Sequence, residues 1–193
     1  YSGNMGLAHP FDAVLDAAAR LRETHDSIQF LFVGEGPRKA DLEAQAARRG
    51  LSNVSFLPFQ PYDRLAESLS AADLHLVTME QEAEGLVVPS KMYGALAAGR
   101  PALFLGPSGS EAARLVQEQS CGTVIDQPTG PSLAAAIRSW HEHPDIESAG
   151  QRARNAVDAG FDRAVDAFDR ILASVARGTT TPSERTLPHP VSG

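Results

Sequence analysis

The chain has 193 residues, of which 42% are hydrophobic and 21% are charged, and its formal net charge is −7. This length allows one well-buried domain with an appendage but not two full domains. The acidic balance argues against a nucleic-acid binder, which needs a basic face to replace counterions. The single cysteine, Cys121, excludes an intrachain disulfide and a cysteine-based metal site. A local basic pocket for a phosphorylated small molecule is still compatible with this charge, because local fields need not follow the net charge.

Short apolar runs alternate along the chain with turns and with helix-forming stretches. We expect the chain to begin at the end of a strand, residues 1–3, as a segment of a longer protein would. Further strands are predicted at 28–33, 54–57, 74–79, 102–105 and 123–125. Helices are predicted at about 10–24, 38–49, 62–71, 90–98, 109–119 and 131–142. Continuous apolar strands joined by helices indicate an α/β fold with a doubly wound, Rossmann-like parallel sheet.

The strand pattern stops near residue 144, so the sheet domain is predicted to cover residues 1–144. Apolar residues recur at helical spacing in 145–158 and 161–176, which we interpret as a helical C-terminal appendage over 145–176. Residues 177–193 are polar and punctuated by proline, and are predicted to be a disordered tail. No apolar run approaches the ~20 residues that a membrane-spanning helix requires.

Open parallel sheets bind ligands beyond the carboxyl ends of their strands. The most informative of the turns expected there leads into the predicted helix 90–98. Ser90 can cap this helix and Lys91 adds a cation to its first turn, where free amides and the helix dipole favour an anion. The alternative is that Ser90 merely starts a helix and Lys91 is a solvated surface residue.

Four ordered motifs carry a resemblance to a known family. The sequence GLVVPSKMYGALAAGRP at 85–101 resembles the donor-binding signature of retaining GT-B glycosyltransferases of family four, or group 1, in their bacterial "PSK" branch. The motifs SGNMG at 2–6, FVGEGP at 32–37 and NVSFLP at 53–58 resemble further segments of that family. The resemblance covers about residues 1–145.

The resemblance implies a function for the chain. It would be the C-terminal half of a GT-B fold, binding a nucleoside-diphosphate sugar, with UDP as the expected nucleotide, for retaining transfer in polysaccharide biosynthesis. The acceptor would bind an N-terminal domain of the same parent chain, so this chain alone is expected to be inactive. No metal or other cofactor and no nucleic acid is expected. A cytoplasmic location is expected, with peripheral association at the inner face of the membrane through the other half.

The resemblance also assigns roles by position. Glu84 is the candidate catalytic residue. The residues assigned to the donor diphosphate and sugar are Gly3, Asn4, Gly6, Gly85, Leu86, Val87, Val88, Ser90 and Lys91. Those assigned to the nucleoside are Gly34, Glu35, Gly36, Pro58, Gln60 and Tyr93.

This chain departs from the family pattern at three points. Gly94 stands where many members carry a ribose-binding glutamate, and residues 4–9 lack the usual basic pair. Lys91 is then the main candidate cation, with Arg100 as a weaker one. Glu80 and Glu82 compete with Glu84 for the first glutamate of the pattern.

Two other functions share this architecture. A nucleotide-sugar 2-epimerase would use the same diphosphate site, and a non-catalytic module would bind a partner protein or no ligand at all. The remaining candidates for chemistry have structural interpretations. His9, just before Pro10, could reach the diphosphate, but we expect it to be a surface residue at a helix start. We expect packed positions for His75 and Cys121, and solvated positions for His141 and His143.

Overall fold

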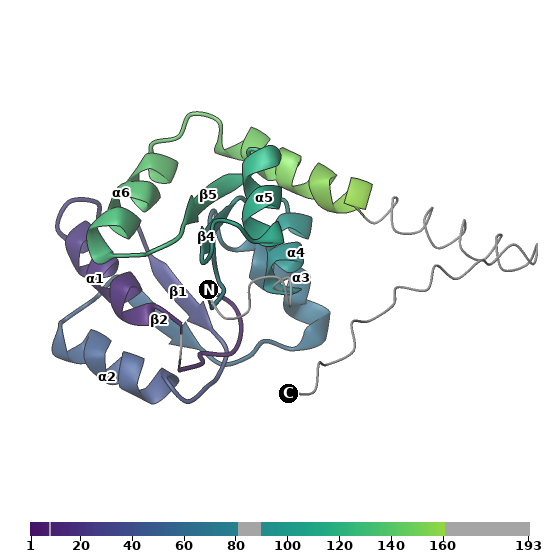
Figure 1. Ribbon diagram of the computed structural model, residues 1–193. Helices are drawn as coiled ribbons and strands as arrows, with labels where there is room; N and C mark the ends of the chain where they lie inside the picture. The colour runs from purple at the N-terminus through teal and green to yellow at the C-terminus, as the bar shows by residue number, and fades with distance from the viewer. Residues whose placement is uncertain (8, 81–89, 161–193) are drawn as a thin grey trace, which may run out of the picture. The chain divides into compact units, whose positions relative to one another are not determined.

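The computed structural model describes residues 1–7, 9–80 and 90–160 (Figure 1). The chain divides into two compact units, Tyr1–Asp158 and Ala159–Gly193. The strands and the named helices all belong to the first unit. Among the described residues, no helix combines the length and the apolar character needed to cross a bilayer.

The structure has five short named strands, and every hydrogen-bonded pair of them is parallel, as predicted. The strands are β1 (Phe30–Val33), β2 (Val54–Leu57), β3 (His75–Thr78), β4 (Ala102–Leu105) and β5 (Gly122–Ile125). They form two hydrogen-bonded ladders, β1-β2 and β3-β4-β5. Residues 1–3 pair with the free edge of β1, through a 2.8 Å bond from the Val33 amide to the Tyr1 carbonyl. This N-terminal segment forms one bridge, Ser2 to Val33. The predicted single sheet is present as two ladders.

Helices connect the strands. They are α1 (Phe11–Arg22), α2 (Lys39–Arg48), the 3-10 helix η1 (Tyr62–Arg64), α3 (Leu65–Ser70), α4 (Ser90–Ala97), α5 (Glu111–Glu118) and α6 (Gly130–His141). Side-chain caps start two of them: Ser110 accepts a bond from the Ala113 amide, and Thr129 forms a capping box with Ser132. The helix predicted at 62–71 is divided between η1 and α3.

The two faces of β4 contact different helices, which confirms the doubly wound architecture. Leu103 and Leu105 belong to a buried cluster that includes side chains of α1 and α6. Ala102 and Phe104 belong to a second cluster that includes side chains of α4 and α5. Figure 1 shows α1 and α6 on one side of the strands and α4 and α5 on the other.

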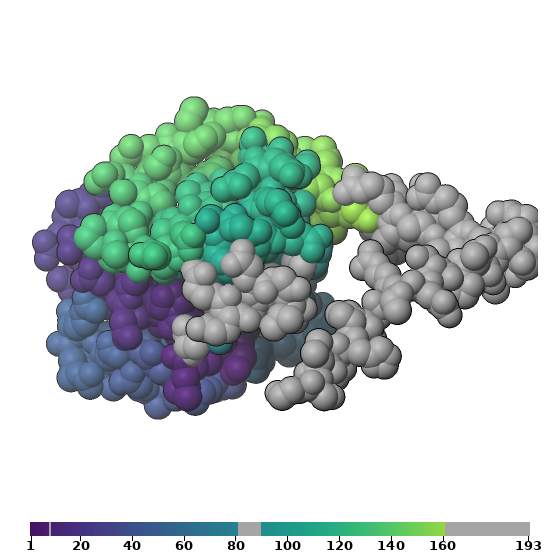
Figure 2. Space-filling model, viewed as in Figure 1, coloured from purple at the N-terminus to yellow at the C-terminus, as the bar shows by residue number. Residues whose placement is uncertain are grey.

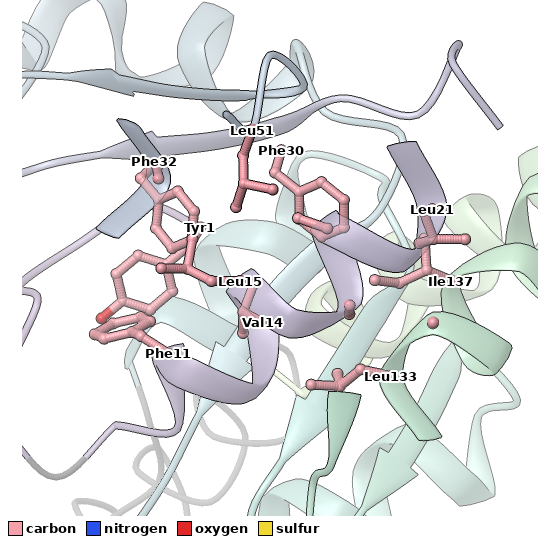
Figure 3. Close-up of a cluster of buried hydrophobic side chains, with 14 of the residues drawn as sticks. Tyr1, Phe11, Val14, Leu15, Leu21, Phe30, Phe32, Leu51, Leu133 and Ile137 are labelled. Atoms are coloured by element: carbon pink, nitrogen blue, oxygen red, sulfur yellow. The ribbon is translucent and has the colours of Figure 1, made fainter. Parts of the chain in front are cut away.

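The first cluster also holds the N-terminal segment in place. The Tyr1 ring packs edge to face on Phe11, with 5.0 Å between ring centroids, and both rings lie beside Phe32 (Figure 3). Residues 1–3 are thereby fixed between β1 and the start of α1.

Residues 146–160 are helical without a break, whereas the sequence predicted that a helix ends at 158. Ala149, Ala153 and Ala156 of this stretch are buried, and Ala153 joins the second cluster. The part of the predicted appendage that the structure describes therefore packs on the sheet domain, up to the end of the first unit at Asp158. The predicted helix 161–176 and tail 177–193 lie outside the described residues, and the predicted domain boundaries stay predictions.

Candidate functional site

The carboxyl ends of the strands bring the predicted turns to one edge of the sheet. Residues 3–9 follow the N-terminal segment, residues 34–36 follow β1, and residues 58–60 follow β2. The end of β3 adjoins this edge as well, because Thr78 contacts the first of these turns. In Figure 2 the N-terminal residues, in purple, reach the surface between the blue and the teal segments.

Two glycine turns at this edge contact each other through their backbones. We call residues 3–6 the first glycine turn and residues 34–36 the second. The Met5 amide donates to the Glu35 carbonyl at 2.7 Å, and the Arg38 amide donates to the Met5 carbonyl at 3.1 Å. A Cβ at Gly36 would lie 2.6 Å from both the amide nitrogen and the carbonyl oxygen of Met5. The segments predicted to bind the diphosphate and the nucleoside are therefore adjacent.

Lys91, in the first turn of α4, reaches across to the first glycine turn. Its Nζ donates to the Tyr1 hydroxyl at 2.6 Å and lies 4.6 Å from the centre of the Tyr1 ring. A Cβ at Gly3 would lie 2.8 Å from this Nζ, so the ammonium occupies the space that the glycine leaves open. Among the described residues, Lys91 forms no ion pair with a carboxylate. Burial lowers the pKa of Lys91 from its usual 10.5.

Tyr1 connects this lysine to the first glycine turn. Its hydroxyl donates to the Asn4 carbonyl at 2.5 Å while it accepts from Lys91. Burial raises the pKa of the Tyr1 phenol to about 12, so the hydroxyl stays protonated and neutral near pH 7. In the part of the chain that the structure describes, the hydrogen-bond partner of this cation is thus neutral and leaves its charge available to an anion.

His9 is also part of this site, and the sequence placed it on the surface. The structure has it partly buried, with Nδ1 at 3.0 Å from the Thr78 hydroxyl oxygen and the ring beside Gly6. Burial, followed by the charge of Lys91, lowers the pKa of His9 below its usual 6.5. Sequence reasoning missed Tyr1 and Thr78 as members of the site, and it preferred a surface position for His9 over contact with the diphosphate, because only the fold brings these residues to Lys91.

The predicted nucleoside residues line the neighbouring part of the edge. Glu35 is exposed, and its carboxylate forms an ion pair with Lys39, at the start of α2, at 2.7 Å. The Gln60 amide donates to the Pro58 carbonyl at 3.0 Å. This segment adjoins the second glycine turn, since a Cβ at Gly34 would lie 3.2 Å from the Phe59 ring.

The start of α4 presents two further predicted residues. Ser90 is exposed, and Tyr93 is 44% exposed, so both side chains are accessible to a ligand. Gly94 lies close to α3, since a Cβ there would lie 3.4 Å from a Leu69 methyl group. The other predicted residues lie outside the described part of the chain, and their roles stay predictions. They are Glu84, Gly85, Leu86, Val87 and Val88, with the competing Glu82.

Arg100 does not belong to the site, so its prediction as a weaker cation is wrong. Its guanidinium donates to the Ser70 carbonyl at 2.8 Å, at the end of α3. Arg100 precedes β4 and follows α4, which places it at the amino ends of the strands. The helix α4 separates it from Lys91, which stands in the first turn of that helix.

The other candidates for chemistry have structural roles. His75 is buried and its Nε2 lies 2.8 Å from the Leu69 carbonyl oxygen, as expected for a packed histidine. Cys121 is buried, and burial raises the pKa of its thiol. Within residues 1–7, 9–80 and 90–160, no group of three His, Cys, Asp or Glu side chains could hold a metal ion.

Comparisons with known proteins agree with the motifs and the fold. The family model of the glycosyl transferases group 1 matches residues 1–159. Putative colanic acid biosynthesis glycosyl transferase WcaI of Escherichia coli (strain K12) is 36% identical over 139 residues, which are 72% of this chain and 34% of WcaI. The crystal structure of WaaG, a glycosyltransferase involved in lipopolysaccharide biosynthesis, matches with a TM-score of 0.62 and 28% identity, over 78% of this chain and 40% of WaaG.

A more distant structure shares the fold alone. HepE of Anabaena, solved in complex with UDP-glucose, matches with a TM-score of 0.66 and 22% identity, over 91% of this chain and 48% of HepE. The chain thus spans about a third of the length of WcaI and less than half of the two solved chains. The α/β fold, the ordered motifs and the family match lead to one conclusion: the chain belongs to the group 1 glycosyltransferases.

Proposed function

We propose that this chain is the donor-binding half of a retaining glycosyltransferase, and that it holds a nucleoside-diphosphate sugar, with uridine as the base. One observation carries the proposal. The Lys91 ammonium lies against the first glycine turn at the carboxyl edge of the sheet, bonded to a neutral hydroxyl rather than to a described carboxylate. A partly buried cation that has no anionic partner among the described residues, at a ligand-binding edge, favours an anionic ligand.

The chemistry of sugar transfer gives this cation a task. A nucleoside diphosphate leaves the sugar with a growing negative charge, which preorganised donors stabilise. The first-turn amides of α4 and the charge of Lys91 would supply such donors without a bound metal. The complex of HepE with UDP-glucose supports the choice of donor, because HepE shares this fold.

The acceptor belongs to a part of the protein beyond this domain. Since the chain spans about a third of WcaI, we propose an N-terminal acceptor domain and transfer in a cleft between the two halves. The names of WcaI and WaaG support a role in polysaccharide or lipopolysaccharide biosynthesis. We further propose a cytoplasmic site of action, at the inner face of the membrane through the acceptor half. By itself this chain would bind donor nucleotide without transferring sugar.

A charge-removal pair tests the proposal. Lys91→Gln is compared with Arg138→Gln, which removes an exposed cation from the last turn of α6. Calorimetry and amide NMR follow the binding of uridine, UMP and UDP, with GDP and dTDP as alternative bases. Because a hydrogen bond to a charged group contributes roughly 1.5–3 kcal/mol, Lys91→Gln should weaken UDP binding about tenfold or more. It should leave uridine binding nearly unchanged, and Arg138→Gln should alter neither.

Two outcomes would contradict the proposal. One is equal weakening of uridine and UDP by Lys91→Gln, which would show that the lysine does not contact phosphate. The other is the absence of amide shifts at Gly3, Gly6 and Lys91 with every nucleotide tried. Thermal unfolding of both variants controls for loss of the contact between Lys91 and Tyr1.

A further inference from the structure

We infer that His9 is a second, proton-dependent ligand of the donor diphosphate, so that binding a sugar nucleotide adds a proton to this imidazole. The inference rests on the proposed function, because it names a further residue and a pH dependence of the same site. It begins from the observation that two basic side chains lie over the two glycines of one turn.

The first glycine turn carries a basic nitrogen at each end. Lys91 Nζ lies over Gly3, 2.8 Å from the position that a Cβ there would take. His9 Nε2 lies beside Gly6, 3.4 Å from the corresponding position. Tyr1 stands between them, with its ring centroid 6.2 Å from that of His9. An anion that contacts the backbone of this turn would therefore meet both nitrogens.

Thr78 fixes which imidazole nitrogen is available. Its hydroxyl oxygen lies 3.0 Å from Nδ1 of His9, so this nitrogen is occupied. Among the described residues, Nε2 has no hydrogen-bond partner. When the ring is protonated, both nitrogens are donors, and Nε2 can then donate to a phosphate oxygen while Nδ1 donates to Thr78.

The surroundings of His9 favour its neutral form in the free protein. Burial and the Lys91 ammonium lower its pKa, and the Glu80 carboxylate, at the end of β3, opposes them with a smaller effect. The Tyr1 phenol is neutral, and Asp12 of α1 is paired with Arg38 at 2.8 Å. A diphosphate placed between His9 and Lys91 adds negative charge and so raises the pKa of His9.

The sign of the pH dependence follows from this difference. Because the pKa of His9 is higher in the complex than in the free protein, affinity is greatest below the free pKa and falls as the pH rises through the bound pKa. One linked proton limits the slope to tenfold in Kd per pH unit. The pH range over which the affinity falls begins below pH 6.5, because the pKa of His9 in the free protein is lowered from that value.

UDP-glucose is the probe for this test. Both of its phosphates are esterified, whereas the terminal phosphate of UDP is a monoester whose second pKa is about 6 and would itself titrate in this range. Calorimetric titrations run from pH 5.5 to 8.5 in two buffers of different ionisation enthalpy, which reports the protons taken up per ligand. GDP-mannose and dTDP-glucose replace UDP-glucose in parallel runs to cover the other bases.

Three variants separate the role of His9 from other effects. His9→Gln should abolish the proton uptake and flatten the pH dependence of Kd. His9→Lys should also flatten it, and should bind at pH 8 more tightly than the unmodified protein does at that pH. His141→Gln, at the exposed end of α6, should behave as the unmodified protein. In the unmodified protein, the NMR-detected pKa of His9 should rise on saturation with UDP-glucose.

The outcomes distinguish this inference from the proposed function. An unchanged His9 pKa in the complex, or equal proton uptake with and without His9→Gln, overturns the inference and leaves donor binding intact. Absence of binding by all three sugar nucleotides at every pH overturns both. The NMR titration needs no substitution, so the test does not depend on whether a variant folds.

Discussion

The glycines of the second glycine turn are required by a backbone contact within the protein. Gly34 and Gly36 have φ angles of +139° and +147°, which side-chain-bearing residues rarely adopt. A Cβ at Gly34 would collide with the Gly3 carbonyl oxygen, and one at Gly36 would meet the backbone of Met5. The motif that resembles a nucleoside-binding turn is thus explained first by the packing of two turns.

A pair of glycine substitutions separates two contributions to stability, the contact between the two glycine turns and the positive φ angle of the glycine. Gly36→Ala should destabilise the domain by roughly 2–4 kcal/mol, because it adds overlap with Met5 to the strained φ. Gly50→Ala should cost only about 1–2 kcal/mol, since φ there is +59° but the nearest atom, at the end of Arg22, is 3.7 Å from the added Cβ. Urea unfolding measures both. Equal losses would show that the contact between the turns contributes nothing.

At the same scale, the site was only partly predictable from the sequence. Lys91 could be identified because its neighbours in sequence form a helix start and a recognisable motif. The bond between His9 and Thr78 joins residues 69 positions apart, and nothing in either local sequence indicates it. The partner of His9 is at the end of β3, so the surroundings of His9 depend on the order of the strands. The local sequence does not contain that order.

Helix boundaries were predictable where side chains define them. Ser110 precedes α5 and Thr129 precedes α6, and each side chain accepts a hydrogen bond from a first-turn amide. The helix α5 accordingly falls within the predicted range 109–119, and α6, at Gly130–His141, is shifted by one residue from the predicted range 131–142. The single helix predicted at 62–71 is divided into η1 and α3. Neither of them contains a buried residue, so burial in the core does not fix their boundaries.

Removal of the α5 cap tests this account. Ser110→Ala leaves the Ala113 amide, now 3.2 Å from the serine oxygen, without its acceptor in a buried position. We expect a loss of about 1 kcal/mol in the free energy of unfolding. Ser52→Ala, an exposed serine outside any helix, is the matched control and should change stability by less than about 0.5 kcal/mol. A loss no greater than that of the control would exclude a stabilising cap.

On the scale of the whole molecule, the sheet has its two faces buried by different helices. The alternation along β4 directs Leu103 and Leu105 to one cluster, and Ala102 and Phe104 to the other. This arrangement was predictable, because continuous apolar strands separated by helices allow few other folds. The division into two ladders was not, since the apolar pattern of the strands does not indicate which of them pair.

Buried His75 makes the stability of the domain depend on pH. Burial lowers its pKa in the folded protein to about 4, against 6.5 for the unfolded chain, so the unfolded chain binds the proton more readily. Its contribution is complete above pH 6.5 and is lost as the pH falls towards 4, by about 3 kcal/mol in total. Denaturant unfolding between pH 4 and 8 should show this slope reduced in His75→Gln and retained in His141→Gln. An unchanged slope in His75→Gln would assign the effect to other groups.

Main-chain hydrogen bonds join the two glycine turns, from the Met5 amide to the Glu35 carbonyl and from the Arg38 amide back to the Met5 carbonyl. The side chains of Asn4, Leu7 and Glu35 project from this framework and are exposed. They can be exchanged without loss of either main-chain bond between the turns. A shift in ligand preference can therefore proceed through these positions while the peptide scaffold beneath them stays the same.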